Sequence, residues 1–288
     1  QMFSDPSAWA LEHPEKAKAD FPLSPKLKTL YRAIIGALLH VVRHTRGDLM
    51  TSVYFAATAM HAPTHLALLA VKKIALFFYD TRDWTLTYDC DKIDKIMLTG
   101  YSDASFCQWP DGRSRVGYVI YVGSPKSIGT SGAIIWNQRL ERARLTATSQ
   151  SETYGLFRLC DRTYHLRYIL HAMGYPQFIG PEDNPEPNDA QHLSVVYCDN
   201  SPTIKQVLAS FTGLRTRAYH STYWKVVEYC SPYQALRIAQ LEWVSTLQQW
   251  ADHQTKILYK PEEYSIQAGM VLHLTESQKA YYKSRRRR

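Results

Sequence analysis

Hydrophobic residues recur every three or four positions in the first third of the chain, a spacing typical of amphipathic helices. Residues 1–26 lack this spacing and are rich in Pro and charge, so we expect them to form an extended arm. The apolar stripe of a first helix follows, with Leu30, Ile34, Leu38 and Val41 on one face. The chain is therefore predicted to begin its folded part near residue 27.

Two further helices and a short strand are predicted before residue 92. One helix covers about residues 49–60, and the next is capped by Thr64 and runs toward Phe78. Large side chains (Trp84, Leu86 and Tyr88) alternate with threonines over residues 84–88, which predicts a short strand. Together these elements make residues 27–92 a small helical segment.

From residue 97 the pattern changes to short apolar runs bounded by turn residues, which is typical of strands. Strands are predicted at 98–106, 117–123, 132–136, 195–198 and 241–244, with helices at 149–173, 201–209 and 217–230 and from about 248. The order βββαβααβα predicts an α/β fold with a mixed five-stranded sheet flanked by helices. We place this domain at residues 97–260 and treat residues 261–288 as a C-terminal extension with a basic tail.

Charge and cysteine content narrow the class of protein. The formal net charge is +8, which favours a polyanionic partner, with nucleic acid before an anionic membrane. The five cysteines are odd in number and never closely spaced, so no zinc pattern or disulfide framework fits them, and we expect buried thiols in a reducing compartment. The longest apolar run, near residues 33–42, is too short for a membrane span.

Four acidic residues, each in its own short motif, are the candidate chemistry of the chain. On the predicted elements, Asp103 lies in the first strand, Glu152 in the first turn of the long helix, Asp199 at the end of the fourth strand and Asp252 at the start of the last helix. Strand ends and helix starts can meet at one edge of a sheet. Packed carboxylates repel one another unless a cation neutralises them, and hard oxygen ligands suit Mg²⁺ or Mn²⁺. Two such ions about 4 Å apart can activate water for phosphodiester hydrolysis.

Each acid also has an ordinary structural explanation. Asp199, which precedes Asn200 and Ser201, can cap a helix, and Glu152 can be a first-turn acid that the helix dipole favours. The combination of four such motifs in this order favours the metal site.

The motifs around these acids resemble those of the ribonuclease H domain of copia-type LTR-retrotransposon polyproteins, preceded by the end of the reverse transcriptase. The matching segments are Gly100–Ala104, Arg113–Ser114, Gly117–Val119, Gly132–Trp136, Ser149–Leu156, Tyr197–Asn200, Arg215–Arg217, Trp250–Asp252 and Thr255–Lys256. Upstream, residues 31–64 resemble the thumb-side segment of the same polymerase. The paired aspartates of the polymerase palm have no counterpart here, so we do not expect this chain to copy a template by itself.

The resemblance implies a ribonuclease H-like fold. It also implies an enzyme that cuts the RNA strand of an RNA–DNA hybrid with two divalent ions, Mg²⁺ or Mn²⁺. Its Asp-Glu-Asp-Asp set corresponds to Asp103, Glu152, Asp199 and Asp252. An alternative register places Thr153 at the glutamate position and disables the site; Gly155 favours Glu152, because the family has a small residue there. His253 is expected at the surface.

Nucleic acid is the expected partner, as an RNA–DNA hybrid or a structured RNA. The candidate phosphate contacts are Arg113, Arg115, Arg139, Arg142, Arg144, Arg285, Arg286, Arg287 and Arg288. A second hypothesis is a domesticated, inactive RNA-binding subunit of a ribonucleoprotein such as a mitochondrial ribosome, with other protein subunits as partners. The first hypothesis implies a cytoplasmic or nuclear location, and the second a mitochondrial or other ribonucleoprotein location.

Overall fold

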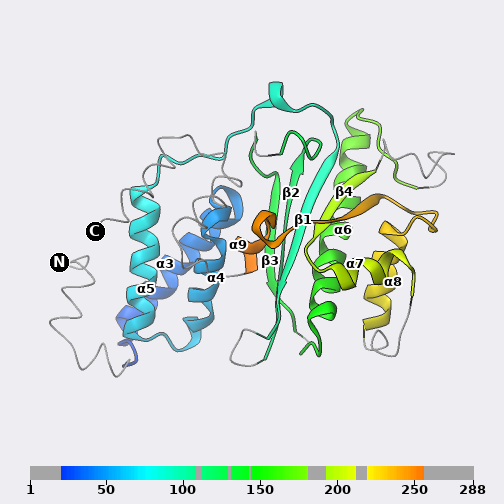
Figure 1. Cartoon of the computed structure of the whole chain (residues 1–288). Helices are drawn as coiled ribbons and strands as arrows, with labels where there is room; N and C mark the ends of the chain where they lie inside the picture. Colours follow the sequence, from blue (N-terminus) through cyan, green and yellow to red (C-terminus); the bar gives the residue numbers. More distant parts are fainter. Residues whose placement is uncertain are drawn as a thin grey trace. The chain divides into compact units, whose positions relative to one another are not determined.

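The computed structural model divides the chain into two units, Gln1–Leu86 and Thr87–Arg288 (Figure 1). The structure describes residues 21–107, 112–128, 131–142, 144–180, 193–211 and 219–255. Most of the predicted arm and the whole predicted C-terminal extension, with Arg285–Arg288, lie outside these ranges. Among the described helices, none combines the length and the apolar composition that crossing a bilayer requires.

The described part of unit 1 is helical. Its elements are α3 (Pro25–His44), α4 (Met50–Ala57) and α5 (His65–Asp80), with 3₁₀ turns at Gly47–Leu49 and Thr58–His61. Pro25 occupies the first turn of α3, where its missing N–H costs nothing. Thr64 caps α5 as predicted, and its hydroxyl accepts a hydrogen bond from the Ala67 amide at 3.2 Å.

The buried face of α3 is rotated by one residue from the predicted stripe. Leu38 is buried as expected, but the other buried residues are Tyr31, Ile35 and Val42. The Tyr31 hydroxyl donates to the Ala56 carbonyl at 2.6 Å, so its ring is buried and its polar atom is satisfied. The prediction considered aliphatic residues alone and therefore missed this tyrosine.

The predicted strand at residues 84–88 is wrong. Arg46 and Asp48 form a buried ion pair at 2.8 Å, and Arg46 also donates to the Thr81 carbonyl at 3.1 Å. The Arg46 guanidinium lies 5.6 Å from the ring centre of Trp84, which is itself buried. Trp84 therefore packs as part of the helical unit. The Thr87 carbonyl accepts a hydrogen bond from the Gly132 amide at 2.8 Å, but residues 84–88 do not form a strand.

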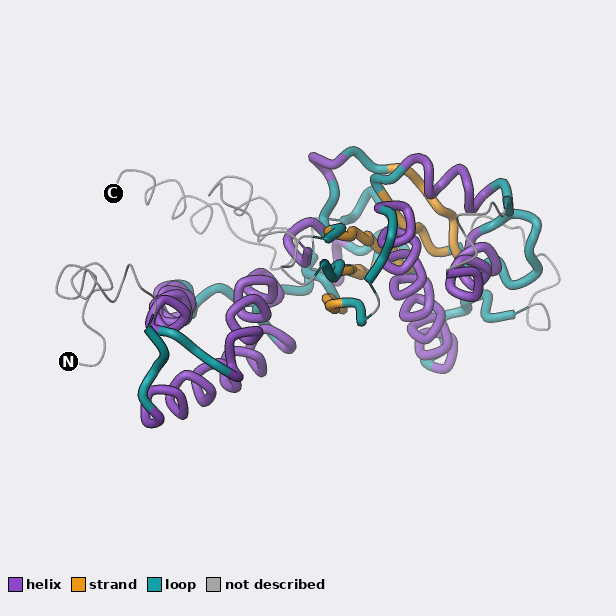
Figure 2. The backbone as a smooth tube through the Cα atoms, turned by 90° about the horizontal axis from the view of Figure 1, so that it is seen from below, coloured by secondary structure: helices purple, strands orange, loops and turns teal. Residues whose placement is uncertain are grey.

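Unit 2 contains a mixed five-stranded sheet flanked by helices, as the sequence predicted (Figure 2). Its strands are β1 (Leu98–Ser105), β2 (Arg115–Val122), β3 (Ile135–Leu140), β4 (Ser194–Cys198) and β5 (Ala239–Trp243). Its helices are α6 (Thr148–Ala172), α7 (Ser201–Leu208), α8 (His220–Cys230) and α9 (Asp252–Thr255), and 3₁₀ turns cover Cys90–Lys92 and Thr246–Gln248. The strand order is β3-β2-β1-β4-β5, with β2 and β3 antiparallel to their neighbours and β4 and β5 parallel to β1.

The two faces of the sheet are covered by different helices. Alternate residues of a strand point to opposite faces. In β1, Gly100 lies against Leu159 of α6, whereas the Asp103 side chain contacts Thr255 of α9. The long helix α6 packs across β1, β2 and β4 and closes the main core with α8, while α9 packs against β1, β2 and β3.

The cysteines follow the prediction in part. Cys160, Cys198 and Cys230 are buried in the core, as expected, but Cys90 and Cys107 are exposed. The latter two lie in connecting segments rather than in core elements, and the prediction of buried thiols is wrong for them.

Candidate active site

The four acidic residues occupy neighbouring ends of their elements. Asp103 lies near the C-terminal end of β1, and Glu152 lies in the second turn of α6. Asp199 directly follows β4, and Asp252 is the first residue of α9. Because β1 and β4 are parallel, their C-terminal ends lie at the same edge of the sheet.

Asp199 links the acids into two overlapping groups. One ligand atom from each of Asp103, Asp199 and Asp252 lies within 4.8 Å of the others. A second group with the same limit contains Glu152, Cys198 and Asp199. Asp103, Glu152 and Asp252 are buried and Asp199 is half-buried, so the carboxylates gather where water screens their repulsion poorly.

Hydroxyl and indole groups orient two of the acids. The Thr255 hydroxyl donates to the Asp103 carboxylate, and it also contacts the Asp252 carbonyl at 3.3 Å. The Thr246 hydroxyl donates to the Asp199 carboxylate at 3.2 Å, and the Trp243 indole donates to the Asp199 carbonyl at 3.1 Å. None of these three residues was predicted to have a role, although Thr255 belongs to the Thr255–Lys256 segment that resembles the family.

A glycine in β2 allows α9 to approach the sheet closely at the site. Gly117 lies directly opposite Asp103, and a Cβ there would lie 2.6 Å from the Cβ of Gln254 and 2.9 Å from the Cγ2 of Thr255. Gly155 lies where α6 meets β1, but a Cβ there would be 3.4 Å from the Asp103 carbonyl, an ordinary contact distance. The absence of a side chain at Gly117 therefore allows α9 to approach the acids.

The local geometry distinguishes Glu152 from Thr153. An oxygen of the Glu152 carboxylate lies 3.9 Å from the Cys198 sulfur at the end of β4. The Thr153 hydroxyl instead donates to the Ser149 carbonyl of its own helix at 2.8 Å. The side chain directed at the strand end is therefore that of Glu152.

The donor set fits a hard divalent cation. Three carboxylates supply oxygen atoms, which Mg²⁺ and Mn²⁺ prefer, and their spacing within 4.8 Å allows them to share one ion after small side-chain rotations. Burial, together with the nearby carboxylates, raises the pKa of the Cys198 thiol well above its ordinary value. The set of three carboxylates contains no thiol, and oxygen donors favour a hard ion.

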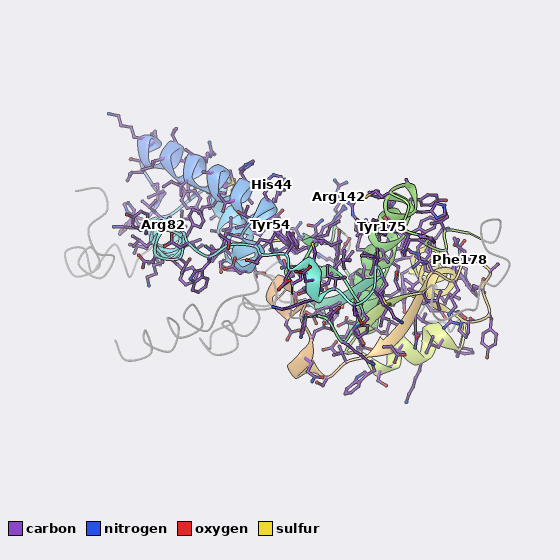
Figure 3. All side chains as sticks on the ribbon, turned by 90° about the horizontal axis from the view of Figure 1, so that it is seen from above. His44, Tyr54, Arg82, Arg142, Tyr175 and Phe178 are labelled. Atoms are coloured by element: carbon purple, nitrogen blue, oxygen red, sulfur yellow. The ribbon has the colours of Figure 1, made fainter. Side chains whose placement is uncertain are left out.

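The arginines predicted to contact phosphates have different environments. Arg139, Arg142 and Arg144 are exposed, and Arg142 is labelled in Figure 3. Arg113 is half-buried. Arg115 is only 2% exposed and donates to the Gln138 side chain at 2.5 Å, so the expectation that Arg115 contacts phosphate is wrong for this structure.

Comparison with known proteins gives one sequence relative. A retrovirus-related Pol polyprotein from transposon RE1 of Arabidopsis thaliana is 24% identical over 173 residues, which cover 60% of this chain and 10% of that protein. The chain thus corresponds to about a tenth of its relative. No family model matches the chain.

Solved structures with lower similarity were also found. The N-terminal RNase H domain of a Mycobacterium tuberculosis protein aligns with 56% of this chain and 91% of its own length, with 11% identity and a TM-score of 0.36. RNase H1 from Halobacterium salinarum aligns with 55% of this chain and 94% of its own length, with 12% identity and a TM-score of 0.35. Since both TM-scores are low, the assignment of the fold rests on the strand order, the strand directions and the helix positions.

These findings confirm the predicted resemblance to a retrotransposon polyprotein. They leave the copia subgroup and the thumb-like role of the helical unit as predictions. The chain is similar to a segment of a retroelement Pol polyprotein, and its α/β unit has a ribonuclease H-like fold.

Proposed function

We propose that unit 2 is a ribonuclease H-type endonuclease that hydrolyses the RNA strand of RNA–DNA hybrids with divalent metal ions. The observation that carries the proposal is the convergence of Asp103, Asp199 and Asp252, with Glu152 joined through Asp199. Four unrelated segments supply these carboxylates, and local capping explains none of the contacts between them. The polyprotein relative supports the same class of nuclease.

In this proposal the carboxylates hold up to two Mg²⁺ or Mn²⁺ ions. When bound, such ions lower the pKa of a coordinated water and stabilise the leaving oxygen of the phosphodiester. The Thr255 hydroxyl holds the Asp103 carboxylate through a hydrogen bond, and the Thr246 hydroxyl holds the Asp199 carboxylate in the same way. These hydrogen bonds fix the ligand geometry before the substrate arrives.

The test is cleavage of a hybrid whose RNA strand is labelled, in the presence of Mg²⁺. The proposal predicts cleavage by the wild type and a loss of at least about 100-fold in Asp103→Asn, which keeps the shape of the side chain but removes its charge. Asp91→Asn is the matched control, because Asp91 is exposed and lies outside both acidic groups. A folded wild-type protein that does not cut the hybrid would refute the proposal.

The alternative of a domesticated RNA-binding subunit predicts tight RNA binding without cleavage. Its main support in the sequence, the basic tail at Arg285–Arg288, lies outside the described residues. No specific feature of the described residues favours it over the nuclease.

A further inference from the structure

A positively charged cavity lies apart from the acidic residues, between α6 and the edge of the sheet. Its volume is about 190 Å³, and its charged lining residues are Arg139 of β3 and Arg158, Asp161 and Arg162 of α6. Three arginines and one aspartate from two elements therefore line the cavity. Pockets for whole small molecules usually span about 300–1,000 Å³, so this cavity suits one small anionic group of a larger ligand.

The cavity opens on the α6 face of the sheet. Val116 and Tyr118 form part of its lining and flank Gly117, which faces α9, so they point to the opposite side. Asn137 pairs with Tyr118 and Arg139 pairs with Val116, which places both residues on the same side as α6. Since β3 is the edge strand, the cavity lies at the margin of the sheet, where a long ligand can pass.

A buried acid holds one of the three arginines. The Nε of Arg158 lies 3.6 Å from a carboxylate oxygen of Glu141, whose side chain is 6% exposed. Within the described residues, neither of these two atoms has a hydrogen-bond partner. The Asp161 side chain is 44% exposed, and its carboxylate lies 4.0 Å from the Nδ1 of His165. Arg139 and Arg162 are exposed, and no ion pair to either is recorded among the described residues.

We propose that this cavity binds a backbone phosphate of the nucleic acid whose scissile bond lies at the carboxylates, and this inference rests on the proposed function. Guanidinium groups bind phosphate through paired, charge-assisted hydrogen bonds, and convergent arginines are the usual protein solution for this anion. An acidic peptide is the competing ligand. The net charge of +8 and the position of the cavity at the same end of the sheet as Asp103 favour nucleic acid.

The position of the cavity relative to the acids follows from the strand register. Val116 pairs on one side with Ala104, the neighbour of Asp103, and on the other side with Arg139, so Arg139 lies two strands from the end of β1. At about 4.8 Å per strand, the backbones at Ala104 and Arg139 are about 10 Å apart. The Asp103 side chain contacts α9 and the cavity opens on the α6 face, so a ligand that reaches both must pass around the edge of the sheet.

The test measures hybrid binding over a range of salt concentrations, in Asp103→Asn protein so that no cleavage occurs. Adding Arg139→Ala and Arg162→Ala is expected to weaken binding about tenfold or more and to reduce the salt slope by about 1–2, because phosphate contacts are lost. Arg139→Lys with Arg162→Lys is expected to retain most of the slope but only part of the affinity, since lysine does not bind in a bidentate manner.

The matched control removes two exposed lysines of unit 2 outside the cavity, Lys126→Ala with Lys205→Ala. Equal salt slopes for the cavity variant and this control would overturn the inference, and so would a hybrid that does not bind at all. Thermal melting confirms that both variants fold.

Two further readouts separate the alternatives. If a nucleoside monophosphate or inorganic phosphate binds in an Arg139-dependent manner while hybrid binding does not change, the cavity is a site for free anions and the inference is wrong. If an acidic peptide binds there and the hybrid does not, the inference is equally wrong. Wild-type protein that fails to cut hybrids, but whose cavity variant shows the loss of slope, would refute the proposed function and leave the phosphate site standing.

Discussion

Replacing Gly117 by alanine tests how the sheet positions α9. The new Cβ would lie 2.6 Å from the Cβ of Gln254 and 2.9 Å from the Cγ2 of Thr255. Carbon atoms in contact are normally about 3.5–4.0 Å apart, so α9 must move by about 1 Å. The nearest atom is a Cβ attached to the helix backbone, and rotating a side chain cannot relieve the clash.

The displacement has two measurable consequences. Overpacking of this kind costs about 1–3 kcal/mol of unfolding free energy. The same shift moves Asp252 and Thr255 relative to Asp103, and a misplacement of about 1 Å in an active site can lower the rate about 100-fold. Gly117→Ala should therefore lose much more hybrid cleavage than its stability loss explains.

Single-turnover cleavage and thermal melting of the same preparations measure the two effects separately. Gly36→Ala is the control, because no atom lies within 4 Å of a Cβ at this position in α3. It should stabilise the protein by about 0.4–1 kcal/mol or leave it unchanged, and should not affect cleavage. Wild-type cleavage and stability in Gly117→Ala would refute the reasoning that this glycine positions α9.

Three further predictions concern the choice between Glu152 and Thr153, the buried face of α3, and the titration of Asp94 at acid pH. Glu152→Gln should abolish cleavage while Thr153→Val retains at least a tenth of it, because only the Glu152 side chain is directed at Cys198. Equal losses in a cleavage assay would contradict the assignment of Glu152 as the site glutamate. Ile35→Ala should lower the unfolding free energy measured by urea denaturation by about 2–5 kcal/mol, since Ile35 is fully buried. Ile34→Ala should lower it clearly less, because Ile34 is half-buried. The reverse order would show that the face of α3 predicted from sequence is the buried one. Hydrogen bonds from the Ser124 side chain and backbone lower the pKa of Asp94 from an ordinary value near 3.8 to about 2, so its carboxylate stabilises the fold above about pH 4 and this contribution disappears as the pH falls through 2. An NMR titration should show the Ser124 amide shifting near pH 2 in the wild type and not in Asp94→Asn, whereas a midpoint near 4 would contradict the assigned hydrogen bonds.

The sequence predicted the element order of unit 2 well because its strands are short apolar runs with clear boundaries. The third strand was placed too early, at 132–136 instead of Ile135–Leu140. Its second half contains Asn137, Gln138 and Arg139, polar residues that an edge strand tolerates and that hide the strand pattern.

The candidate acids were identifiable because each stands in its own short motif and the motifs follow one another in a characteristic order. The residues that orient them were not. Thr255 and Thr246 act through hydrogen bonds that depend on tertiary placement, and Gly117 matters because α9 crosses β2 there. Arg115 was predicted to contact phosphate, but its side chain is buried beside Gln138. Strand alternation alone did not reveal this burial.

The central claim is that the converging carboxylates support metal-dependent hydrolysis of the RNA strand. Single-turnover cleavage of hybrids labelled on either strand, with Mg²⁺ and after chelation, tests it most directly. The account predicts Mg²⁺-dependent cutting of the RNA strand alone, which chelation abolishes and added Mg²⁺ restores. Intact RNA after incubation with folded wild-type protein and Mg²⁺, or cleavage that persists after chelation, would contradict it.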